Sequence, residues 1–276
     1  MNEDNTKITG HYKIIDETRI YYESCGNGIP FVCIHSAGAC SMEFHEFMSI
    51  IATKGFRAIA IDLPGHGKSY PVNWQPFRVM HEYAEFVWKI IELICLDEKP
   101  IISGCSIGGN MVTDMACYNS ENLLAALAFE GAALTPFYEL DAYEEPHACP
   151  GWHSIMERAA LSSSYQPMAA EKAVELRWLH RYSSQEVAVG DMLCWSNHNV
   201  LDKMKNVQCP YLVLMGEADI FLAEELLDLT IAEIPNGLWE KAIGKKMGHY
   251  PMFEQPEALA QIVMDFLHRK SVILGE

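Results

Sequence analysis

The chain has 276 residues, which is long enough to bury the core of one catalytic domain and does not by itself require a second domain. With 37 acidic and 20 basic side chains, its formal net charge is −17. Nucleic acids and anionic membranes are bound by basic patches, so this charge argues against both as main partners. The first residues form no leader, no apolar run reaches bilayer length, and nine cysteines include no C-x-x-C pair. We therefore expect a cytoplasmic protein with reduced thiols.

Short apolar runs alternate along the chain with longer stretches of helical period. Two segments of alternating polarity, residues 12–15 and 20–22, predict an antiparallel hairpin at the edge of a sheet. Apolar residues at helical spacing predict helices over 86–94 and 259–267. Buried parallel strands are predicted at residues 31–34, 58–61, 100–102, 123–129 and 211–215. This order predicts an α/β fold with a doubly wound, mostly parallel sheet.

The alternation stops over residues 135–208, where no run resembles a buried strand. Amphipathic stretches at 155–161 and 169–182 predict helices instead. Because a long structureless loop is unusual inside a compact domain, we expect an inserted helical cap over a core formed by residues 1–134 and 209–276. The apolar side chains that such a cap offers to a substrate include Trp152, Trp178, Trp195, Met156, Met168 and Met192.

A candidate nucleophile lies where the strand at 100–102 passes into a helical stretch. Gly104-Cys105-Ser106-Ile107-Gly108 reads G-x-S-x-G. In a nucleophile elbow the serine occupies a sharp strand-to-helix turn, and the two glycines let neighbouring backbones approach closely. Ser106 is therefore the residue that we expect to attack a substrate.

A serine hydroxyl needs a base and an orienting acid, because it is protonated at neutral pH. His249 is the best base, since it precedes the last predicted helix on a loop that can reach over the sheet. Asp219 is the best acid, because it follows the strand at 211–215. Ligands of open α/β sheets bind just past the strand ends. The order Ser106, Asp219, His249 is the one that threads a single hydrolase sheet.

With these residues in place, the chain resembles the α/β-hydrolase fold family from Tyr12 to Leu267. The motifs that carry the resemblance are His35-Ser36-Ala37-Gly38, Asp62-Leu63-Pro64-Gly65-His66-Gly67-Lys68-Ser69, the G-x-S-x-G at Ser106, and the pair Gly216 to Asp219 with Gly248-His249. The resemblance implies a cap inserted after the sixth strand, where the alternation stops. It also implies that no cofactor is used.

The resemblance further implies an oxyanion hole made of two backbone N–H groups, those of Ile107 and Ala37. Such donors stabilise the negative charge that develops on a substrate oxygen. Ser36 stands where many family members have glycine, a departure that enol-lactone hydrolases of the same fold share. Its hydroxyl is a further candidate donor.

Glu130 is a rival for the role of Asp219, because some family members place their acid at the end of the sixth strand. His35 and His66 are interpreted as histidines that brace loops. His147, Cys149 and His153 have loosely metal-like spacing, but in an aromatic cap they are interpreted as packing residues, so no metal is expected. One helical face is predicted to be solvated or, as the alternative, to contact an anionic substrate; its residues are Arg177, His180 and Arg181.

These features predict a cofactor-independent serine hydrolase that cleaves a small, fairly apolar carboxylic ester, lactone or thioester through an acyl-enzyme on Ser106. One alternative is a carbon–carbon bond hydrolase of vinylogous diketones, which uses the same three residues and a substrate carboxylate that cap arginines can pair. Another is a non-enzymatic small-molecule receptor with a vestigial triad. The expected partner is a small-molecule substrate, and a homodimer is compatible with the sequence.

Overall fold

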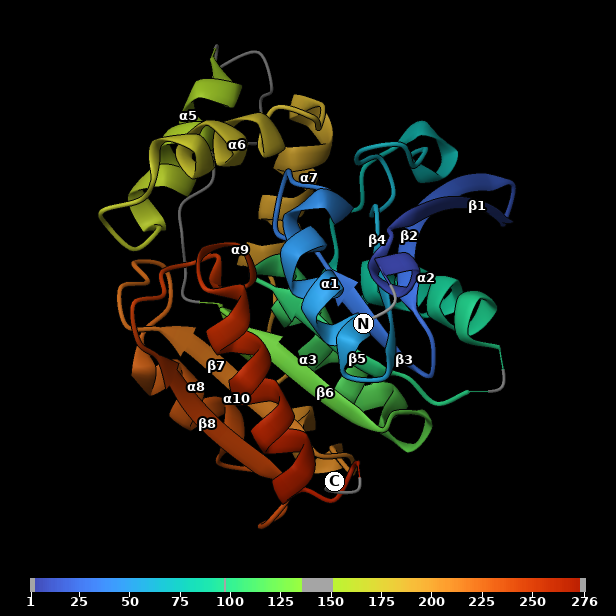
Figure 1. Cartoon of the computed structure of the whole chain (residues 1–276), viewed down its shortest axis with the longest axis vertical. Helices are drawn as coiled ribbons and strands as arrows, with labels where there is room; N and C mark the ends of the chain where they lie inside the picture. The colour runs from blue at the N-terminus through green and yellow to red at the C-terminus, as the bar shows by residue number, and fades with distance from the viewer. Residues whose placement is uncertain (1–2, 97, 136–150, 274–276) are drawn as a thin grey trace.

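The computed structural model describes residues 3–96, 98–135 and 151–273, and its centre is an eight-stranded sheet (Figure 1). The strand order is β1-β2-β4-β3-β5-β6-β7-β8. β2 pairs with β1 and β4 in antiparallel register, and every other pair is parallel. The strands are β1 (Thr9–Ile15), β2 (Thr18–Gly26), β3 (Ile29–Ile34), β4 (Phe56–Ile61), β5 (Ile101–Cys105), β6 (Ala125–Phe129), β7 (Tyr211–Gly216) and β8 (Trp239–Gly244).

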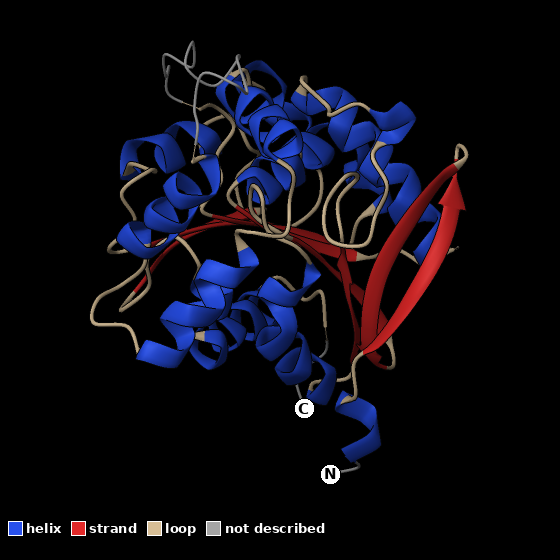
Figure 2. Ribbon diagram, turned by 90° about the horizontal axis from the view of Figure 1, so that it is seen from above, coloured by secondary structure: helices blue, strands red, loops and turns tan. Residues whose placement is uncertain are grey.

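Helices cover both faces of the sheet (Figure 2). The α-helices are α1 (His45–Thr53), α2 (Met80–Cys95), α3 (Ile107–Asn119), α5 (Trp152–Ser163), α6 (Ala170–Leu179), α7 (Gln185–Ser196), α8 (Glu224–Ile231), α9 (Pro251–Glu254) and α10 (Pro256–Arg269). Short 3₁₀ helices are η1 (Glu3–Thr6), η2 (Ser41–Phe44), η3 (Val72–Trp74), η4 (Ser120–Asn122) and η5 (Leu201–Asn206). The doubly wound, mostly parallel α/β fold is confirmed.

The core consists of two apolar layers separated by the sheet. Successive strand side chains point to opposite faces, so Val32 and Ile34 pack into the layer that holds α2, α3 and α8. Phe31 and Cys33 pack into the other layer, with α1, α9 and α10. Burial on both faces explains why these parallel strands read as continuous apolar runs.

The sequence predicted the hairpin, the central strands and the helices α2 and α10, but it did not predict β8. This strand lies at the edge of the sheet, and most of its residues are only partly buried. Trp239-Glu240-Lys241-Ala242-Ile243-Gly244 therefore carries charged side chains and lacks the apolar run of a central strand.

The helices α5, α6 and α7 follow β6 in the chain and lie together at the top of Figure 1. They meet the loops at the strand ends: the Ser163 carbonyl accepts the backbone N–H of His249 at 2.8 Å. Asp191 of α7 accepts the N–H of Gly38, which follows β3, at 3.0 Å. Among the described residues, no helix is long and apolar enough to cross a bilayer.

Candidate active site

Ser106 lies between β5 and α3 in a strained backbone conformation. Its φ and ψ angles are 57° and −119°, a region that non-glycine residues rarely adopt. Its N–H donates to the Phe129 carbonyl at 2.9 Å. A Cβ atom on Gly104 would lie 2.3 Å from the Gly108 carbonyl oxygen, and one on Gly108 would lie 2.4 Å from the Ile34 carbonyl oxygen. The two glycines therefore make this sharp turn sterically feasible.

His249 and Asp219 come together from the loops after β8 and β7. The Asp219 Oδ2 atom lies 2.6 Å from Nδ1 of His249, and its Oδ1 accepts the N–H groups of Phe221 and Leu222. Burial alone would raise the Asp219 pKa, but the imidazole and these hydrogen bonds lower it below its usual range. Asp219 is thus an ionised carboxylate that holds the imidazole by Nδ1. No described group pairs with Nε2 of His249.

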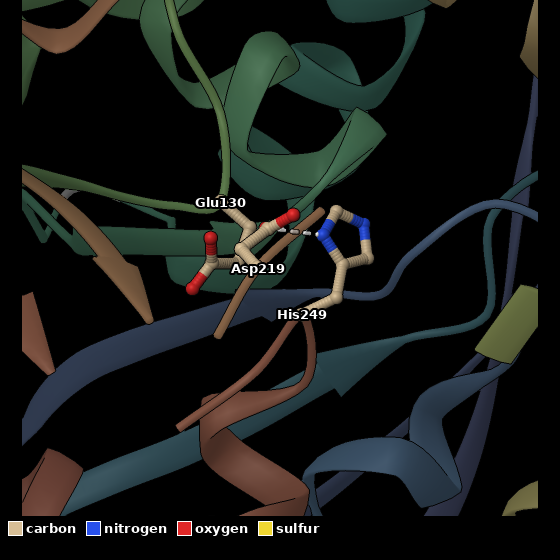
Figure 3. A group of neighbouring side chains, drawn as sticks. All are labelled: Glu130, Asp219 and His249. Carbon is tan, nitrogen blue, oxygen red and sulfur yellow. Dashed lines mark hydrogen bonds and ion pairs between the residues drawn. The ribbon is translucent and has the colours of Figure 1, made fainter. Parts of the chain in front are cut away.

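Glu130 lies beside Asp219, but it does not bind the imidazole (Figure 3). It is buried at the end of β6, has a φ of 50°, and accepts the Gly216 N–H through Oε1 at 2.6 Å. Burial, a side-chain hydrogen bond with Asp219 and the charge of Asp219 raise the Glu130 pKa well above its ordinary value. The shift favours the protonated, neutral form of Glu130. Potential metal-ligand atoms of Glu130, Asp219 and His249 lie within 4.8 Å of one another. A protonated carboxyl is a poor metal ligand, however, so this group does not suit a metal ion.

A cavity of about 120 Å³ opens over Ser106 and is lined by helices α5 and α7 and by the strand-end loops. Among the described residues, no Lys, Arg, Asp or Glu side chain lines it. The lining residues are Ser36, Ala37, Ser106, Ile107, Trp152, Ile155, Met156, Ala159, Met192, Trp195, Phe221, His249 and Tyr250. The cavity thus combines largely apolar walls with the hydroxyl of Ser106 and the imidazole of His249.

Two of the tryptophans and two of the methionines that we expected to face a substrate do line this cavity, but Trp178 and Met168 do not. Trp178 is 57% exposed on the outer face of α6, and Met168 borders a different groove, near Phe253. The helical pattern of the sequence shows which side chains share a face of a helix, but it does not show which face packs toward the sheet.

Ala37 and Ile107, whose backbone N–H groups we expect to form the oxyanion hole, line the same cavity. Neither N–H is hydrogen-bonded to another group in the described part of the chain. Ser36 differs from our expectation: its hydroxyl donates to Oε1 of Glu43 at 2.6 Å, so it is already committed to a protein acceptor. The prediction that the Ser36 hydroxyl is available to donate a hydrogen bond to a substrate is wrong.

The interpretation of His35 and His66 as loop braces is confirmed. His35 accepts the Leu63 N–H through Nε2 at 3.0 Å, so its Nδ1 carries the proton and donates to the Ser36 carbonyl at 2.8 Å. Burial and the neighbouring His66 lower the His35 pKa well below its ordinary value, in agreement with this neutral tautomer. His66 is fully buried and pairs with Asp191 at 2.8 Å.

Other predicted clusters do not form as expected. His147 and Cys149 lie outside the described residues, and His153 is exposed, so it is not the packing residue that we predicted. Arg177, His180 and Arg181 do not share one environment: the arginines are exposed, whereas His180 is 2% exposed. The helix α6 ends at Leu179, so helical spacing does not extend through His180 and Arg181.

A doubly wound sheet whose strand ends place a strained serine and a carboxylate-bound histidine on one cavity is the arrangement of a hydrolase. The model of the "Alpha/beta hydrolase family" matches residues 31–262, and the chain belongs to this family. This finding confirms the resemblance of the sequence motifs.

Individual relatives are distant. The chain is 21% identical to a pimeloyl-[acyl-carrier protein] methyl ester esterase of Yersinia enterocolitica, over 92% of this chain and 99% of that protein. It is 23% identical to a 2-hydroxy-6-oxononadienedioate/2-hydroxy-6-oxononatrienedioate hydrolase of Dechloromonas aromatica, over 91% of each. The enol-lactonase of Burkholderia xenovorans superposes with a TM-score of 0.81 at 16% identity, over 93% of this chain and 99% of that one. A protein of Mycobacterium phage D29 named as a non-heme haloperoxidase is 26% identical, and the match covers 44% of this chain but only 42% of that protein.

Proposed function

We propose that the protein is a cofactor-independent serine hydrolase that cleaves a small, uncharged, fairly apolar carboxylic ester, lactone or thioester. One observation carries this proposal: His249 is held through Nδ1 by an ionised Asp219, while its ring and Ser106 face the same apolar cavity. A histidine held in this way has Nε2 available as a general base.

In the proposed reaction, Nε2 of His249 takes the proton of Ser106 while Oγ attacks the substrate carbonyl carbon. The tetrahedral oxyanion is stabilised by the N–H groups of Ala37 and Ile107, each worth roughly 3 to 4 kcal/mol. The imidazolium then protonates the leaving alcohol or thiol as its bond to carbon breaks, which leaves an acyl ester on Ser106. Water, deprotonated by His249, hydrolyses this ester and restores the serine.

We also propose that residues 135–208 act as a cap on a core of residues 1–134 and 209–276. Trp152 and Met156 from α5, and Met192 and Trp195 from α7, contribute much of the cavity wall. Apolar side chains that can change rotamer accept varied acyl or alcohol groups. In this arrangement the sheet supplies the chemistry and the α5–α7 segment selects the substrate.

The absence of charged lining side chains in the described residues favours an ester over a dienoic diketone. A carboxylate buried in this cavity without a cationic partner would pay a large desolvation penalty. The cap arginines do not supply the partner, because Arg177 and Arg181 are exposed and Arg181 pairs with Glu157. A receptor with a vestigial triad has no need of an ionised acid bound to the histidine.

The experiment is the hydrolysis of p-nitrophenyl acetate and of a dienoic diketone by the wild type, Ser106→Ala and the control Ser49→Ala, whose serine lies on α1 and donates to the His45 carbonyl. We expect ester turnover that falls at least roughly a thousandfold in Ser106→Ala alone. A phosphonate should label Ser106 stoichiometrically. Turnover of the diketone but not the ester would favour the carbon–carbon hydrolase, and no turnover of either would favour the receptor.

A further inference from the structure

Of the three successive N–H groups in the loop after β3, residues 36–38, the outer two have protein acceptors and the central one does not. The N–H of Ser36 donates to Oε2 of Glu43 at 2.9 Å, and the N–H of Gly38 donates to Oδ2 of Asp191 at 3.0 Å. Between them, the N–H of Ala37 has no acceptor in the described part of the chain and borders the cavity over Ser106. Buried carboxylates thus occupy the two outer donors and leave the central one for a ligand.

The carbonyl groups of this loop are held as firmly as its N–H groups. The Ser36 carbonyl accepts Nδ1–H of His35 at 2.8 Å and the N–H of Ala39 at 3.2 Å. In a trans peptide the C=O and the N–H point in opposite directions. Fixing the Ser36 carbonyl therefore also fixes the direction of the Ala37 N–H.

The outer end of the loop is held by the α6–α7 region rather than by the sheet. Gly38 has a φ of 68°, its N–H donates to Asp191, and its carbonyl accepts the Ser183 hydroxyl at 3.0 Å. Both partners lie far along the chain, Asp191 being 153 residues after Gly38. Both backbone polar groups of Gly38 therefore bind side chains of the α6–α7 region.

Asp191 is itself fixed in place by His66. The Asp191 side chain is 1% exposed, and the oxygen that accepts the Gly38 N–H also lies 2.8 Å from Nε2 of His66. Nδ1 of His66 lies 3.2 Å from the Pro64 carbonyl, so both ring nitrogens face acceptors and both carry protons. Burial lowers the His66 pKa, but the Asp191 charge and these hydrogen bonds raise it by more. The Asp191 carboxylate thus favours the charged form of His66, and the two side chains hold each other in place.

We propose that Asp191 is a positioning residue of the active site: from α7 it holds the Ala37–Gly38 peptide and, together with the contacts that fix the Ser36 carbonyl on the other side of Ala37, keeps the Ala37 N–H directed at the substrate oxygen. This inference rests on the proposed function, because it assigns Ala37 to the oxyanion hole. The α5–α7 segment then completes the catalytic machinery as well as forming the pocket wall.

The test compares Asp191→Ala with Asp191→Asn in p-nitrophenyl acetate hydrolysis. The alanine removes the acceptor of the Gly38 N–H, and we expect kcat to fall roughly a hundredfold with KM changed by less than about threefold, as for loss of an oxyanion donor. The asparagine keeps an acceptor oxygen in the same place and should retain kcat within about fivefold. Rescue by asparagine is a result that general destabilisation would not give.

Asp114→Ala is the matched control, since Asp114 is another buried carboxylate that binds a histidine, His81, at 2.8 Å on the far turns of α3. It should lower stability without changing kcat.

Because Asp191→Ala leaves His66 without its partner, the double variant His66→Phe/Asp191→Leu replaces the whole pair with apolar groups, which proteins often tolerate. This double variant should also lose roughly a hundredfold in kcat, as expected for the loss of one oxyanion-hole donor.

Normal kcat in a folded Asp191→Ala or in the double variant would overturn the inference. So would an asparagine variant as slow as the alanine variant, because the charge and not the acceptor would then matter. Ser106→Ala separates the two proposals: full activity in that variant defeats the proposed function, whereas its inactivity together with a fast Asp191→Ala defeats only the positioning role.

Discussion

The buried histidine–carboxylate pairs His249–Asp219 and His66–Asp191 differ in what the imidazole nitrogen that does not bind the carboxylate does. His249 binds Asp219 through Nδ1 at 2.6 Å, and its Nε2 has no partner among the described residues. His66 binds Asp191 through Nε2 at 2.8 Å, and its Nδ1 donates to the Pro64 carbonyl. Within the described residues, Nε2 of His249 is thus available to a ligand, whereas both ring nitrogens of His66 face protein acceptors.

The comparison shows that a buried histidine–carboxylate pair does not by itself identify a general base. Pairing orients an imidazole and raises its affinity for a proton, but catalysis also requires a free nitrogen beside the nucleophile. His249 lines the cavity together with Ser106, and His66 is fully enclosed. We therefore expect removal of the two rings to affect different properties.

The largest effect on activity is expected for His249→Gln. Loss of the base should lower kcat for p-nitrophenyl acetate by roughly ten-thousandfold or more. The comparison variant, His66→Gln, removes the imidazole that pairs with buried Asp191 and should lower the free energy of unfolding by about 3 kcal/mol. Steady-state kinetics and chemical denaturation of both variants measure the contrast, and an active His249→Gln would remove the distinction between the pairs.

The next effect concerns the two carboxyl groups beside His249. Asp219→Asn should lower kcat roughly a thousandfold or more, because the amide cannot stabilise the imidazolium, whereas Glu130→Gln should cost less than about tenfold. The neutral state of Glu130 should also appear as a protonated-carboxyl infrared band at pH 7 that Glu130→Gln lacks. If the kinetic order of the two variants were reversed, Glu130 would be the acid.

A smaller, pH-dependent effect is expected for Glu43, the carboxyl that holds Ser36. Burial raises its pKa from 4.5 to about 7, although hydrogen bonds from Ser36 oppose the shift. Between these values the folded protein binds more protons than the unfolded chain, so the stability of the wild type falls as the pH rises. The stability of Glu43→Gln relative to wild type should therefore increase by about 2 kcal/mol between roughly pH 5 and 8. Urea unfolding at both pH values tests this, and a constant difference would contradict it.

The smallest effect is expected at the cavity wall, which belongs to neither pair. Trp152→Ala or Trp195→Ala should raise KM for a preferred ester by roughly tenfold and change the ranking of substrates, while phosphonate labelling of Ser106 continues at nearly the wild-type rate. Trp178→Ala is the control, because Trp178 is 57% exposed and does not line the cavity. An unchanged substrate profile in both wall variants would show that the α5–α7 segment does not select the substrate.

Sequence reasoning located the fold and the Ser106 turn because both depend on local patterns. Apolar runs identify strands buried on two faces, and glycines near Ser106 identify a turn in which backbones nearly touch. The pairing of His249 with Asp219 rather than Glu130 could not be decided in this way. Both carboxylates follow strands, and only the path of each loop decides which one meets Nδ1.

The contacts of Asp191 left no signal in the sequence. Its partners Gly38 and His66 are 153 and 125 residues away, and an aspartate in a helix is most often a solvated residue. The charged edge strand β8 was missed for a related reason, since partial exposure removes the apolar run that marks a strand. Long-range polar contacts and half-exposed elements depend on the assembled fold.

The bond between Gly38 and α7 also bears on how this enzyme could diverge or be engineered. Exchanging the α5–α7 segment between relatives is a reasonable strategy when this segment only shapes a binding surface. Here any transplanted segment must supply an acceptor where the Asp191 carboxylate lies, or the N–H of Gly38 is left unsatisfied next to Ala37. We therefore expect an exchanged α5–α7 segment to function only when it is transferred together with the loop after β3 that it binds.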